Sequence, residues 1–437
     1  MYFRGTISPS FLIFIKKYDI IYIEIEKDYH KLRERIRRKM ELTKKQQEGL
    51  KIAIKRFQEH QKCTVISGFA GTGKSTLVRF IVAALEEYGI DPDADVVFTS
   101  FTGKACNVLQ KKGNRNVLTL CKLLYDYRLI GEKQFMKTPK DTIEYKVVIV
   151  DEVSMAPMEL MQQLFTHDAY IICLGDPFQL PPVDPTADNH LLDTPHVFLD
   201  EVMRQAEESE IIQITMSLRK GKNLEYFRGN EAQILPKNQI STGMLVWADQ
   251  VLCATNKTRE SINMTMRRLK GFEGLPQIGD KMICLRNYWD ILSDDNYIPL
   301  VNGTIGYIQS IEEDTLPVYY YRKFVRNVEL FKVTILTDNG ETYSDIYLDK
   351  NYLLTGKKSL TYKEEARIKR QAEHYPRFNK IPQDWTYGYA ITCHKSQGSE
   401  WDNVLVIEEN FPFGRDEHAR WVYTACTRAA EKLVLLR

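Results

Sequence analysis

A glycine-rich turn within residues 63–76, CTVISGFAGTGKST, contains the residue types that bind phosphate groups. An apolar run precedes the glycines and a helix-forming run follows them, which argues against a plain glycine turn. In this order, backbone amides and a helix N-terminus surround an anion, a lysine reaches the β- and γ-phosphates, and a hydroxyl binds magnesium. We therefore predict an ATP site formed by Gly68, Gly71, Thr72, Gly73, Lys74, Ser75 and Thr76.

Two adjacent carboxylates, Asp151 and Glu152, follow the apolar run YKVVIV at 145–150. Neighbouring residues on a strand point in opposite directions, so one carboxylate can hold Mg²⁺ while the other polarises the attacking water. We assign Asp151, together with Ser75, to the metal and Glu152 to the base. Acidic residues also favour the first turn of a helix, which is the alternative explanation of the pair.

A third candidate is Gln179 in GDPFQLPPV, residues 175–183, which follows the apolar run AYIICL. Parallel strands bring their carboxyl ends to one edge of a sheet, so Asp176 and Gln179 should lie near the acid pair. A glutamine there can accept a hydrogen bond from the water and donate one to the γ-phosphate, and the rigid prolines would carry the movement onward. Gln179 is then the coupling residue; an amide that only caps the turn is the alternative.

The composition restricts the other classes of site. The chain has 437 residues and a formal net charge of +2, so any nucleic-acid surface must be a local basic patch. Its length predicts about two to four domains. The eight cysteines are scattered without a Cys-x-x-Cys pair, which favours reduced core thiols in a cytoplasmic compartment over zinc or disulfides. No segment reaches the roughly twenty apolar residues that cross a membrane, so no membrane partner is expected.

The order of these motifs, from Leu42 to the C-terminus, resembles that of superfamily 1B DNA helicases of the RecD-like and Dda-like branch. Six further segments resemble motifs of that family: LTKKQQ (42–47), TSFTGKA (99–105), DEVMRQ (200–205), ATNKTRESIN (254–263), AITCHKSQGSEW (390–401) and VYTACTRA (422–429). The resemblance implies ATP hydrolysis coupled to 5′–3′ translocation on single-stranded DNA and to unwinding of forked duplex DNA. It also implies a monomer in a bacterial or phage-infected cell, with single-strand-binding or replication and recombination proteins as partners.

The resemblance further implies roles for single residues. Gln46 would read the adenine edge and Glu400 would hold the ribose. Arg204 would contact the phosphates, and Arg428 would be an arginine finger that stabilises the transition state together with Lys74. An arginine supplied by a second domain can offset charge on the γ-phosphate only when the cleft is closed, and a solvated surface arginine is the alternative.

The DNA backbone would be contacted by hydroxyls and other donors that carry no base preference. The candidates are Thr102, Lys104, Asn256, Thr392, His394, Lys395 and Ser396. His394 has no second His or Cys at ligand spacing, which argues against a metal site. Two positions depart from the family pattern: Phe101 stands where proline is usual and Cys121 where histidine is usual, and both changes could alter the grip on DNA. Base stacking by Phe101, Trp385 or Tyr387 competes with a core role for each.

The predicted fold is α/β, with two tandem RecA-like P-loop NTPase domains and ATP between them. The expected segments are an accessory extension at 1–41, a first domain at 42–197 with a hairpin or pin insertion at about 119–145, a second domain at 198–268 and 384–437, and a β-rich SH3-like insertion at 269–383. In the insertion, alternating apolar residues and Asn-Gly turns predict hairpins.

Several alternatives stay open at this point. The hairpin predicted at 125–140 is either a strand-separating pin, with Phe135 and Met136 near its tip or flank, or an ordinary surface hairpin. The basic stretch at 360–382 is either a solvated helix or a DNA backbone contact. The function could instead be that of an RNA helicase, or of a nucleic-acid-stimulated ATPase that remodels complexes without unwinding.

Overall fold

The computed structural model describes residues 42–129, 135–181, 189–203, 208–294, 298–320, 323–338, 340–372, 380–410 and 414–437. The chain divides into two compact units, Met1–Glu48 and Gly49–Arg437. The described end of the first unit is the start of α2 (Lys44–Gln58). There Thr43 N donates to Gln46 Oε1 at 3.0 Å and Gln46 N donates to Thr43 Oγ1 at 3.3 Å, a reciprocal pair that caps the helix.

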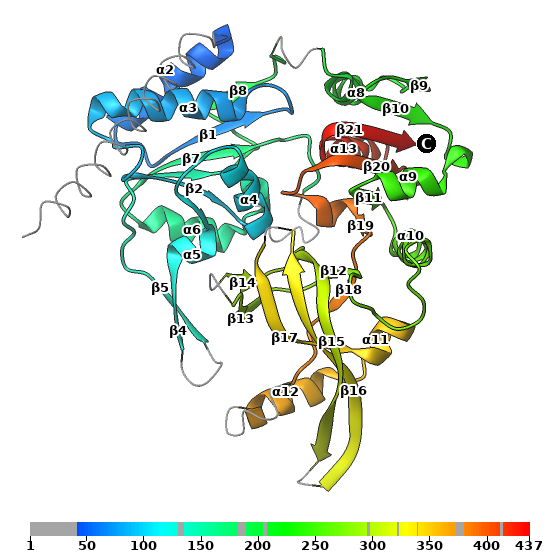
Figure 1. Ribbon diagram of the computed structural model, residues 1–437. Helices are drawn as coiled ribbons and strands as arrows, with labels where there is room; N and C mark the ends of the chain where they lie inside the picture. The colour runs from blue at the N-terminus through cyan, green and yellow to red at the C-terminus, as the bar shows by residue number, and fades with distance from the viewer. Residues whose placement is uncertain are drawn as a thin grey trace, which may run out of the picture. The chain divides into compact units, whose positions relative to one another are not determined.

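The second unit begins with a parallel sheet that has the order β3-β2-β6-β7-β1-β8 among the described residues (Figure 1). Its strands are β1 (Cys63–Gly68), β2 (Val96–Ser100), β3 (Val117–Thr119), β6 (Val147–Val150), β7 (Tyr170–Gly175) and β8 (Val197–Leu199). The connecting helices are α3 (Lys74–Leu85), α4 (Gly103–Lys111), α5 (Leu120–Leu124) and α6 (Met158–Thr166), with short 3₁₀ turns at Glu86–Tyr88 and Val153–Met155.

Both faces of this sheet are buried, because successive strand residues enter two different hydrophobic cores. Ile149 belongs to the core that contains Leu77 of α3. Its neighbour Val148 belongs to the core that contains Leu160 of α6. This double burial explains why the central strands are continuous apolar runs in the sequence, as is usual for parallel sheets covered by helices.

A hairpin leaves the first sheet after α5. Strands β4 (Tyr125–Leu129) and β5 (Phe135–Pro139) pair antiparallel from Tyr125 with Pro139 to Leu129 with Phe135. This is the hairpin predicted at 125–140. Its turn at 130–134 and the side chains of Phe135 and Met136 lie outside what the structure describes.

A second α/β sheet has the order β19-β11-β20-β21-β10-β9 in the described part of the chain, and only β9 is antiparallel there. Its strands are β9 (Phe227–Arg228), β10 (Ala232–Leu235), β11 (Gln250–Cys253), β19 (Ala390–Thr392), β20 (Trp401–Ile407) and β21 (Ala429–Leu436). Its helices are α8 (Glu210–Arg219), α9 (Thr242–Trp247), α10 (Asn256–Leu269) and α13 (Arg415–Cys426), with 3₁₀ turns at Lys237–Gln239 and Cys393–Ser396. The prediction of two tandem RecA-like domains is confirmed.

The segment between α10 and β19 is β-rich, as predicted. Antiparallel strands in the order β17-β16-β15-β12-β18 make up its main described sheet. They are β12 (Lys281–Cys284), β15 (Ile305–Tyr320), β16 (Lys323–Thr337), β17 (Thr342–Asp349) and β18 (Trp385–Tyr387). A small pair, β13 (Tyr288–Leu292) and β14 (Pro299–Leu300), and the helices α11 (Lys350–Thr355) and α12 (Tyr362–Ala372) complete it. The likeness to an SH3 barrel stays a prediction.

Two boundaries differ from those expected. Phe198 and Leu199 pair with β1, so the first sheet runs past the predicted end of its domain at Val197. Trp385 and Tyr387 pair with β12, so the sheet of the insertion runs past Gln383. These two aromatic side chains are 1% and 3% exposed, so both belong to the hydrophobic core. Neither can stack on a base in this arrangement.

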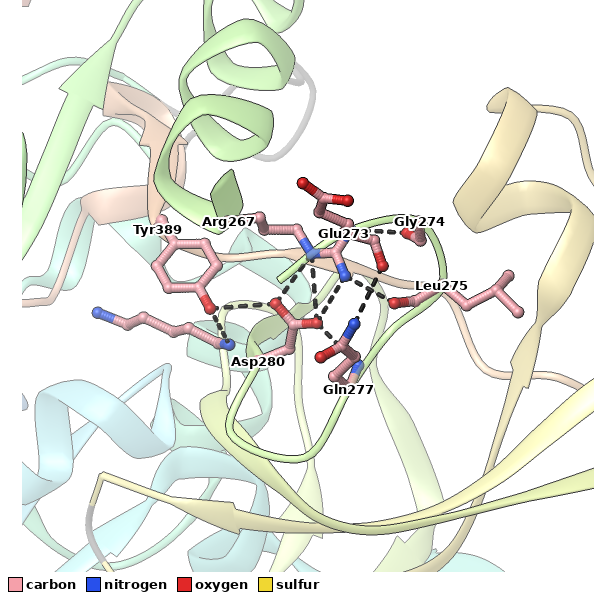
Figure 2. Close-up of polar contacts among 8 residues, drawn as sticks. Arg267, Glu273, Gly274, Leu275, Gln277, Asp280 and Tyr389 are labelled. Carbon is pink, nitrogen blue, oxygen red and sulfur yellow. Dashed lines mark hydrogen bonds and ion pairs between the residues drawn. The ribbon is translucent and has the colours of Figure 1, made fainter. Parts of the chain in front are cut away.

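A buried ion pair joins the insertion to the second domain (Figure 2). The Arg267 side chain from α10 donates to Asp280 with N···O distances of 3.0 to 3.2 Å, and it also donates to the carbonyl oxygens of Gly274 and Leu275 at 2.7 Å. Tyr389, just before β19, donates to Asp280 at 3.1 Å. The segments that enter and leave the insertion are therefore fastened to each other.

The remaining expectations concern cysteines and membranes. All eight cysteines lie in the described ranges and carry free thiols. Burial raises the pKa of those at 106, 253, 284 and 393 to about 12, which keeps them protonated and unreactive. Within the described residues, no helix is both long enough and apolar enough to cross a bilayer.

Candidate active site

The phosphate-binding loop connects β1 to α3, and glycine is required at several of its positions. Gly71 and Gly73 have φ values of 76° and 78°, the left-handed region that favours glycine. A Cβ on Gly68 would lie 2.9 Å from the Cβ of Leu199 and from Thr72 Oγ1, so the close approach of β8 also requires a glycine. Lys74 Nζ donates to the carbonyl oxygens of Gly68 and Phe69 at 2.6 and 3.1 Å. The lysine is thus held directly over the loop.

Ser75 and Thr76 lie in the first turn of α3, where Ser75 is exposed and Thr76 is half-buried. Their position follows from the loop itself, because Gly73 turns the chain directly into the helix. Both hydroxyls and the helix N-terminus are therefore placed where an anion would be bound.

The acid pair lies at the end of β6. Burial raises the pKa of Asp151 to about 6, with a further contribution from Glu152, while Lys74 acts in the opposite direction. Glu152 has a φ of 51°, an uncommon left-handed backbone for a residue with a side chain and a known feature of functional turns. Its amide donates to Asp151 Oδ1 at 3.0 Å.

Gln179 is brought to this pair as predicted. Its Nε2 donates to Glu152 Oε1 at 3.5 Å, across a gap in sequence of 27 residues. The structure therefore brings together Glu152 and Gln179 by hydrogen bonding, and Lys74 and Asp151 by charge. These are four of the six predicted catalytic residues.

A magnesium ion fits the donors at this point. Among the described residues no group of three or more His, Cys, Asp or Glu side chains could enclose a metal ion. Magnesium does not need such a cage, because it usually takes one or two carboxylate or hydroxyl ligands and completes its shell with phosphates and water. The buried carboxylate of Asp151 and the exposed hydroxyl of Ser75 are ligands of that kind.

The loop after β7 contacts the second domain, which the sequence did not reveal. The Asp176 carboxylate is 3% exposed and accepts hydrogen bonds from Tyr423 OH at 2.5 Å and from Phe178 N at 2.9 Å. Tyr423 OH also accepts one from Ala70 N in the phosphate-binding loop at 2.8 Å. The Phe178 ring lies edge-on to Tyr423, with centroids 5.1 Å apart.

The same loop is held at its far end. Leu180 N donates to Thr424 Oγ1 at 2.8 Å, and Gln397 Nε2 donates to Leu180 O at 2.5 Å. Tyr423, Thr424 and Gln397 were not singled out as site residues from the sequence. The only available signal was their position inside the segments VYTACTRA and AITCHKSQGSEW.

Of the two predicted arginines, the structure describes Arg428 but not Arg204. Arg428 is buried, and its guanidinium donates to Thr424 O at 3.1 Å, Ser399 O at 3.2 Å and Thr427 Oγ1 at 3.1 Å, all within the second domain. These contacts exclude the alternative of a solvated surface residue, but they do not bring Arg428 to Lys74. Arg204 lies outside the described residues, although Met203 before it donates from its amide to Gly71 O at 2.9 Å.

The two remaining nucleotide-binding candidates, Gln46 and Glu400, contact other side chains or backbone groups of the protein. Gln46 lies in the first unit, where its side chain accepts the hydrogen bond from Thr43 that caps α2. Glu400 forms an ion pair with Lys112, at the end of α4, at 3.3 Å. The adenine and ribose contacts therefore remain predictions.

The predicted DNA-contacting residues of the first domain lie against the second domain. Thr102 caps α4 by accepting from Ala105 N at 3.2 Å, and a Cβ on Gly398 would lie only 3.1 Å from the same Thr102 hydroxyl. Lys104 Nζ lies 3.9 Å from the centre of the Trp401 ring. Phe101 is partly buried against the first-domain core.

The second-domain candidates are unequal in exposure. Burial lowers the pKa of His394 and lowers that of Lys395 to about 8, while both side chains stay partly accessible. Ser396 is fully buried and donates to Cys393 O at 2.6 Å, so a direct DNA contact is contradicted and it supports its own turn instead. Thr392 is nearly buried at the start of that turn. Asn256 is exposed in the first turn of α10.

Comparison with known proteins shows similarity to helicases. A family model described as an AAA domain matches residues 41–233, and one described as a UvrD-like helicase C-terminal domain matches residues 387–436. The ATP-dependent DNA helicase dda of Enterobacteria phage T4 is 25% identical over 443 residues, which cover 89% of this chain and 97% of that protein. The chain is therefore similar to DNA helicases of the RecD2 and Dda kind, in agreement with the resemblance of its motifs to superfamily 1B.

Two further similarities were found. The ATP-dependent RecD2 DNA helicase of Deinococcus radiodurans is 26% identical over 400 residues, covering 85% of this chain but only 46% of that protein. The chain therefore spans less than half of RecD2 and nearly all of dda. A Pif1 structure from Bacteroides bound to single-stranded DNA gives a TM-score of 0.45 at 17% identity, covering 91% of this chain and 92% of that chain.

The contacts of Tyr423 connect three of the sequence motifs. They join the phosphate-binding loop and the GDPFQL loop, both of the first domain, to the last sequence motif of the second domain. Three motifs that lie far apart in the sequence therefore meet at one hydroxyl group. The segment near the C-terminus is therefore hydrogen-bonded directly to the phosphate-binding loop.

Proposed function

We propose that the chain is an ATP-dependent DNA helicase that couples ATP hydrolysis to 5′–3′ translocation on single-stranded DNA and to duplex unwinding. The observation that carries this proposal is the double attachment of the loop at 176–180. At one end it bonds to Tyr423, which also bonds to the phosphate-binding loop, and at the other it bonds to Gln397, in the segment expected to contact DNA. A movement of this loop that follows a change at the γ-phosphate would therefore be transmitted to the segment expected to contact DNA.

Hydrolysis would be carried by residues that are already close together. Lys74 would bind the β- and γ-phosphates, with Gly68 to Thr76 around them. Magnesium, held by Ser75 and Asp151, would neutralise charge on the phosphates. Glu152 would take the proton of the attacking water, and Gln179, hydrogen-bonded to Glu152, would orient that water.

Arg428 would act only after a domain movement. Its three hydrogen bonds to its own domain hold the guanidinium away from solvent, and at least one of them must be exchanged for a phosphate oxygen when the cleft closes. Arg428→Lys should therefore lower kcat for ATP by about a hundredfold or more while leaving ATP binding nearly unchanged. Equal ATPase activity in Arg428→Lys and wild-type protein would contradict the finger role.

Single-stranded DNA would bind along the segments that contain Thr102, Lys104, Asn256, Thr392, His394 and Lys395. Their side chains suit phosphate oxygens and cannot read bases, which is what a translocase requires. The β4–β5 hairpin would separate the strands of a forked duplex. The T4 and Deinococcus relatives are both DNA helicases, which favours DNA over RNA as the substrate.

The decisive experiment compares two duplexes, one with a 5′ single-stranded tail and one with a 3′ tail, with Lys74→Ala as the inactive control. Unwinding from the 5′ tail alone, absent in Lys74→Ala, is the expected result. Unwinding from the 3′ tail alone would support ATP-driven unwinding but would contradict the proposed 5′–3′ polarity. Stronger ATPase stimulation by RNA than by DNA homopolymers would favour an RNA helicase.

A second candidate function is the remodelling of complexes without unwinding. Removal of the β4–β5 hairpin distinguishes this function from that of a helicase. Replacing residues 126–138 with a short Gly-Ser link should abolish unwinding and spare ATPase activity stimulated by single-stranded DNA. Because β4 and β5 pair only with each other among the described residues, their removal should not disturb the parallel sheet. Unchanged unwinding after this replacement would show that the hairpin is not the pin.

A further inference from the structure

A ribbon of two strands projects from the sheet of the insertion. Strands β15 and β16 pair with each other along their whole described length, from Gly306 with Thr337 to Tyr320 with Lys323. The neighbouring strand β17 pairs only with residues 330–336 of β16, so the far part of the ribbon, beyond Leu330, has no further strand beside it in the described structure. At about 3.4 Å per residue, this part extends on the order of 20 Å.

The far end of the ribbon exposes aromatic side chains. Tyr320 is 52% exposed and Phe324 is 57% exposed. Tyr319 lies edge-on to Phe324 with centroids 6.0 Å apart, and the Arg367 guanidinium lies 4.6 Å from the centre of the Tyr320 ring. Because neighbouring residues of a strand point to opposite faces, Phe324 lies with Tyr319 on one face of the ribbon, and Tyr320 lies with Arg367 on the other.

Helix α12 fixes this arrangement without using the motor domains (Figure 1). Ile368 of α12 packs with Leu316 and Val328 of the ribbon in a small separate core. Arg326 of β16 forms an ion pair with Glu364 of α12 at 2.6 Å, and Arg367 donates to Tyr319 O at 3.4 Å. The helix therefore holds the end of the ribbon in place, with an exposed ring on each of its faces.

The charge of this surface is positive. Lys323, Lys363, Lys369 and Arg370 are all exposed. Glu364 of α12 is already paired with Arg326, and Glu329 of the ribbon is paired with Lys350. Among the described carboxylates of α12 and of the ribbon beyond Leu330, Glu365 is then the one left to offset these cations. The chain as a whole has a net charge of only +2, so this is a local concentration.

We propose that the far end of the β15–β16 ribbon, together with α12, is a second binding surface for single-stranded nucleic acid, separate from the path along the motor domains. Exposed rings stack on bases of any sequence, and the lysines and arginines beside them attract the backbone. The proposal rests on the proposed function only in that the chain must bind nucleic acid. A bare hydrophobic patch would suit a protein partner, but the surrounding cations complement a polyanion.

The experiment measures the binding of two fluorescent oligo(dT) strands to the full chain by anisotropy, without nucleotide. A 12-mer can occupy only the motor path, whereas a 50-mer is long enough to reach the ribbon as well. The double variant Tyr320→Ala/Phe324→Ala should weaken binding of the 50-mer by roughly tenfold or more and leave the 12-mer unchanged, because each stacked base contributes about this much. Tyr226→Ala, which removes a ring that is 60% exposed in the second domain, is the matched control and should change neither.

Two further variants make the result specific. Tyr320→Leu/Phe324→Leu keeps apolar area but cannot stack, so it should behave like the alanine variant. Lys363→Gln/Lys369→Gln should reduce the slope of log affinity against log salt for the 50-mer by about 1.4, at roughly 0.7 per phosphate contact.

Other outcomes would overturn the proposal. Equal loss on both strand lengths would place the rings in the motor path, and no loss on either would remove them from DNA binding. Retention of binding by the leucine variant, or self-association of wild-type protein that the alanine variant abolishes, would indicate a protein-binding surface. A wild-type chain that binds DNA without unwinding would refute the proposed function and leave this inference intact.

Discussion

The hydroxyl of Tyr423 donates a hydrogen bond of 2.5 Å to Oδ2 of Asp176, and these residues belong to different α/β domains. The same hydroxyl accepts from Ala70 N, so one oxygen atom connects both domains and the phosphate-binding loop. Burial and the nearby Asp176 carboxylate hold the pKa of Tyr423 well above its usual value, so the bridge stays protonated at any physiological pH.

Removing this hydroxyl should uncouple the domains. Tyr423→Phe keeps the ring against Phe178 but leaves Ala70 N–H and the buried Asp176 carboxylate without this partner. We expect a loss of about 1–3 kcal/mol in the free energy of unfolding and a roughly tenfold fall in DNA-stimulated kcat, with a smaller change in the KM for ATP. Denaturant titration and steady-state ATPase assays measure both quantities.

A double-mutant cycle with Asp176→Asn tests whether the pair acts as one unit. If the hydrogen bond is the cause, the double variant should be no worse than the poorer single variant. Additive losses in kcat would show that the two residues act independently and would contradict the bridge.

The wild-type protein should have a lower free energy of unfolding at neutral pH than the Asp151→Asn variant, which has an uncharged side chain of similar shape. Its folded-state pKa of about 6 lies above the ordinary value, so ionisation opposes folding, and this cost grows as pH rises through about 6. Asp151→Asn keeps the acceptor for Glu152 N. We expect it to raise the free energy of unfolding by up to about 3 kcal/mol at pH 8, and by much less near pH 4, while abolishing ATP hydrolysis.

The measurement is denaturant unfolding at several pH values in the presence of a chelator and without nucleotide. A stabilisation that is the same at pH 4 and pH 8 would rule out the ionisation of Asp151 as its cause.

DNA affinity should fall as Lys395 loses its proton. Burial lowers the pKa of Lys395 to about 8, and Arg259 contributes in the same direction. The ammonium group is charged below that pH, so binding of single-stranded DNA should weaken between pH 7 and pH 9 at constant ionic strength. Lys395→Arg, which stays charged throughout, should bind with little dependence on pH in this range. An equal pH dependence in both proteins would show that another group is responsible.

The ion pair of Arg267 and Asp280 should matter for stability and not for chemistry. Asp280→Ala would leave a buried guanidinium without its carboxylate, at a cost of about 3–5 kcal/mol in the free energy of unfolding. Replacing both residues, as in Arg267→Met/Asp280→Leu, should recover much of that loss. Binding of a fluorescent ATP analogue should be unchanged in every variant that folds. Weaker binding would show that the Arg267–Asp280 ion pair influences the nucleotide site.

Local motifs could be predicted because their geometry follows from a few consecutive residues. The strand, glycines and helix around Lys74 specify the loop, and Asp151 and Glu152 follow a strand that is apolar throughout. Gln179 was predicted correctly to lie near Glu152 because parallel strands end at one edge of a sheet.

Contacts between distant segments could not be predicted in the same way. No periodicity in the sequence indicates that Tyr423 meets Asp176 across 247 positions, or that Arg428 is bound within its own domain. Burial was also hidden, because Ser396 and Trp385 have the residue types of exposed binding sites and occupy the interior. In each case the outcome depends on which segments fold against them.

The contact between Gly398 and Thr102 has a mechanical consequence. Gly398 has a φ of 70°, and even a methyl group there would come within 3.2 Å of Thr102 Oγ1 and Ala105 Cβ. Packed atoms resist compression, so a side chain at Gly398 would have to push Thr102 and Ala105 away. The absence of a side chain at this one position therefore sets how closely the two domains can lie together here, and even Gly398→Ala should widen the space between them.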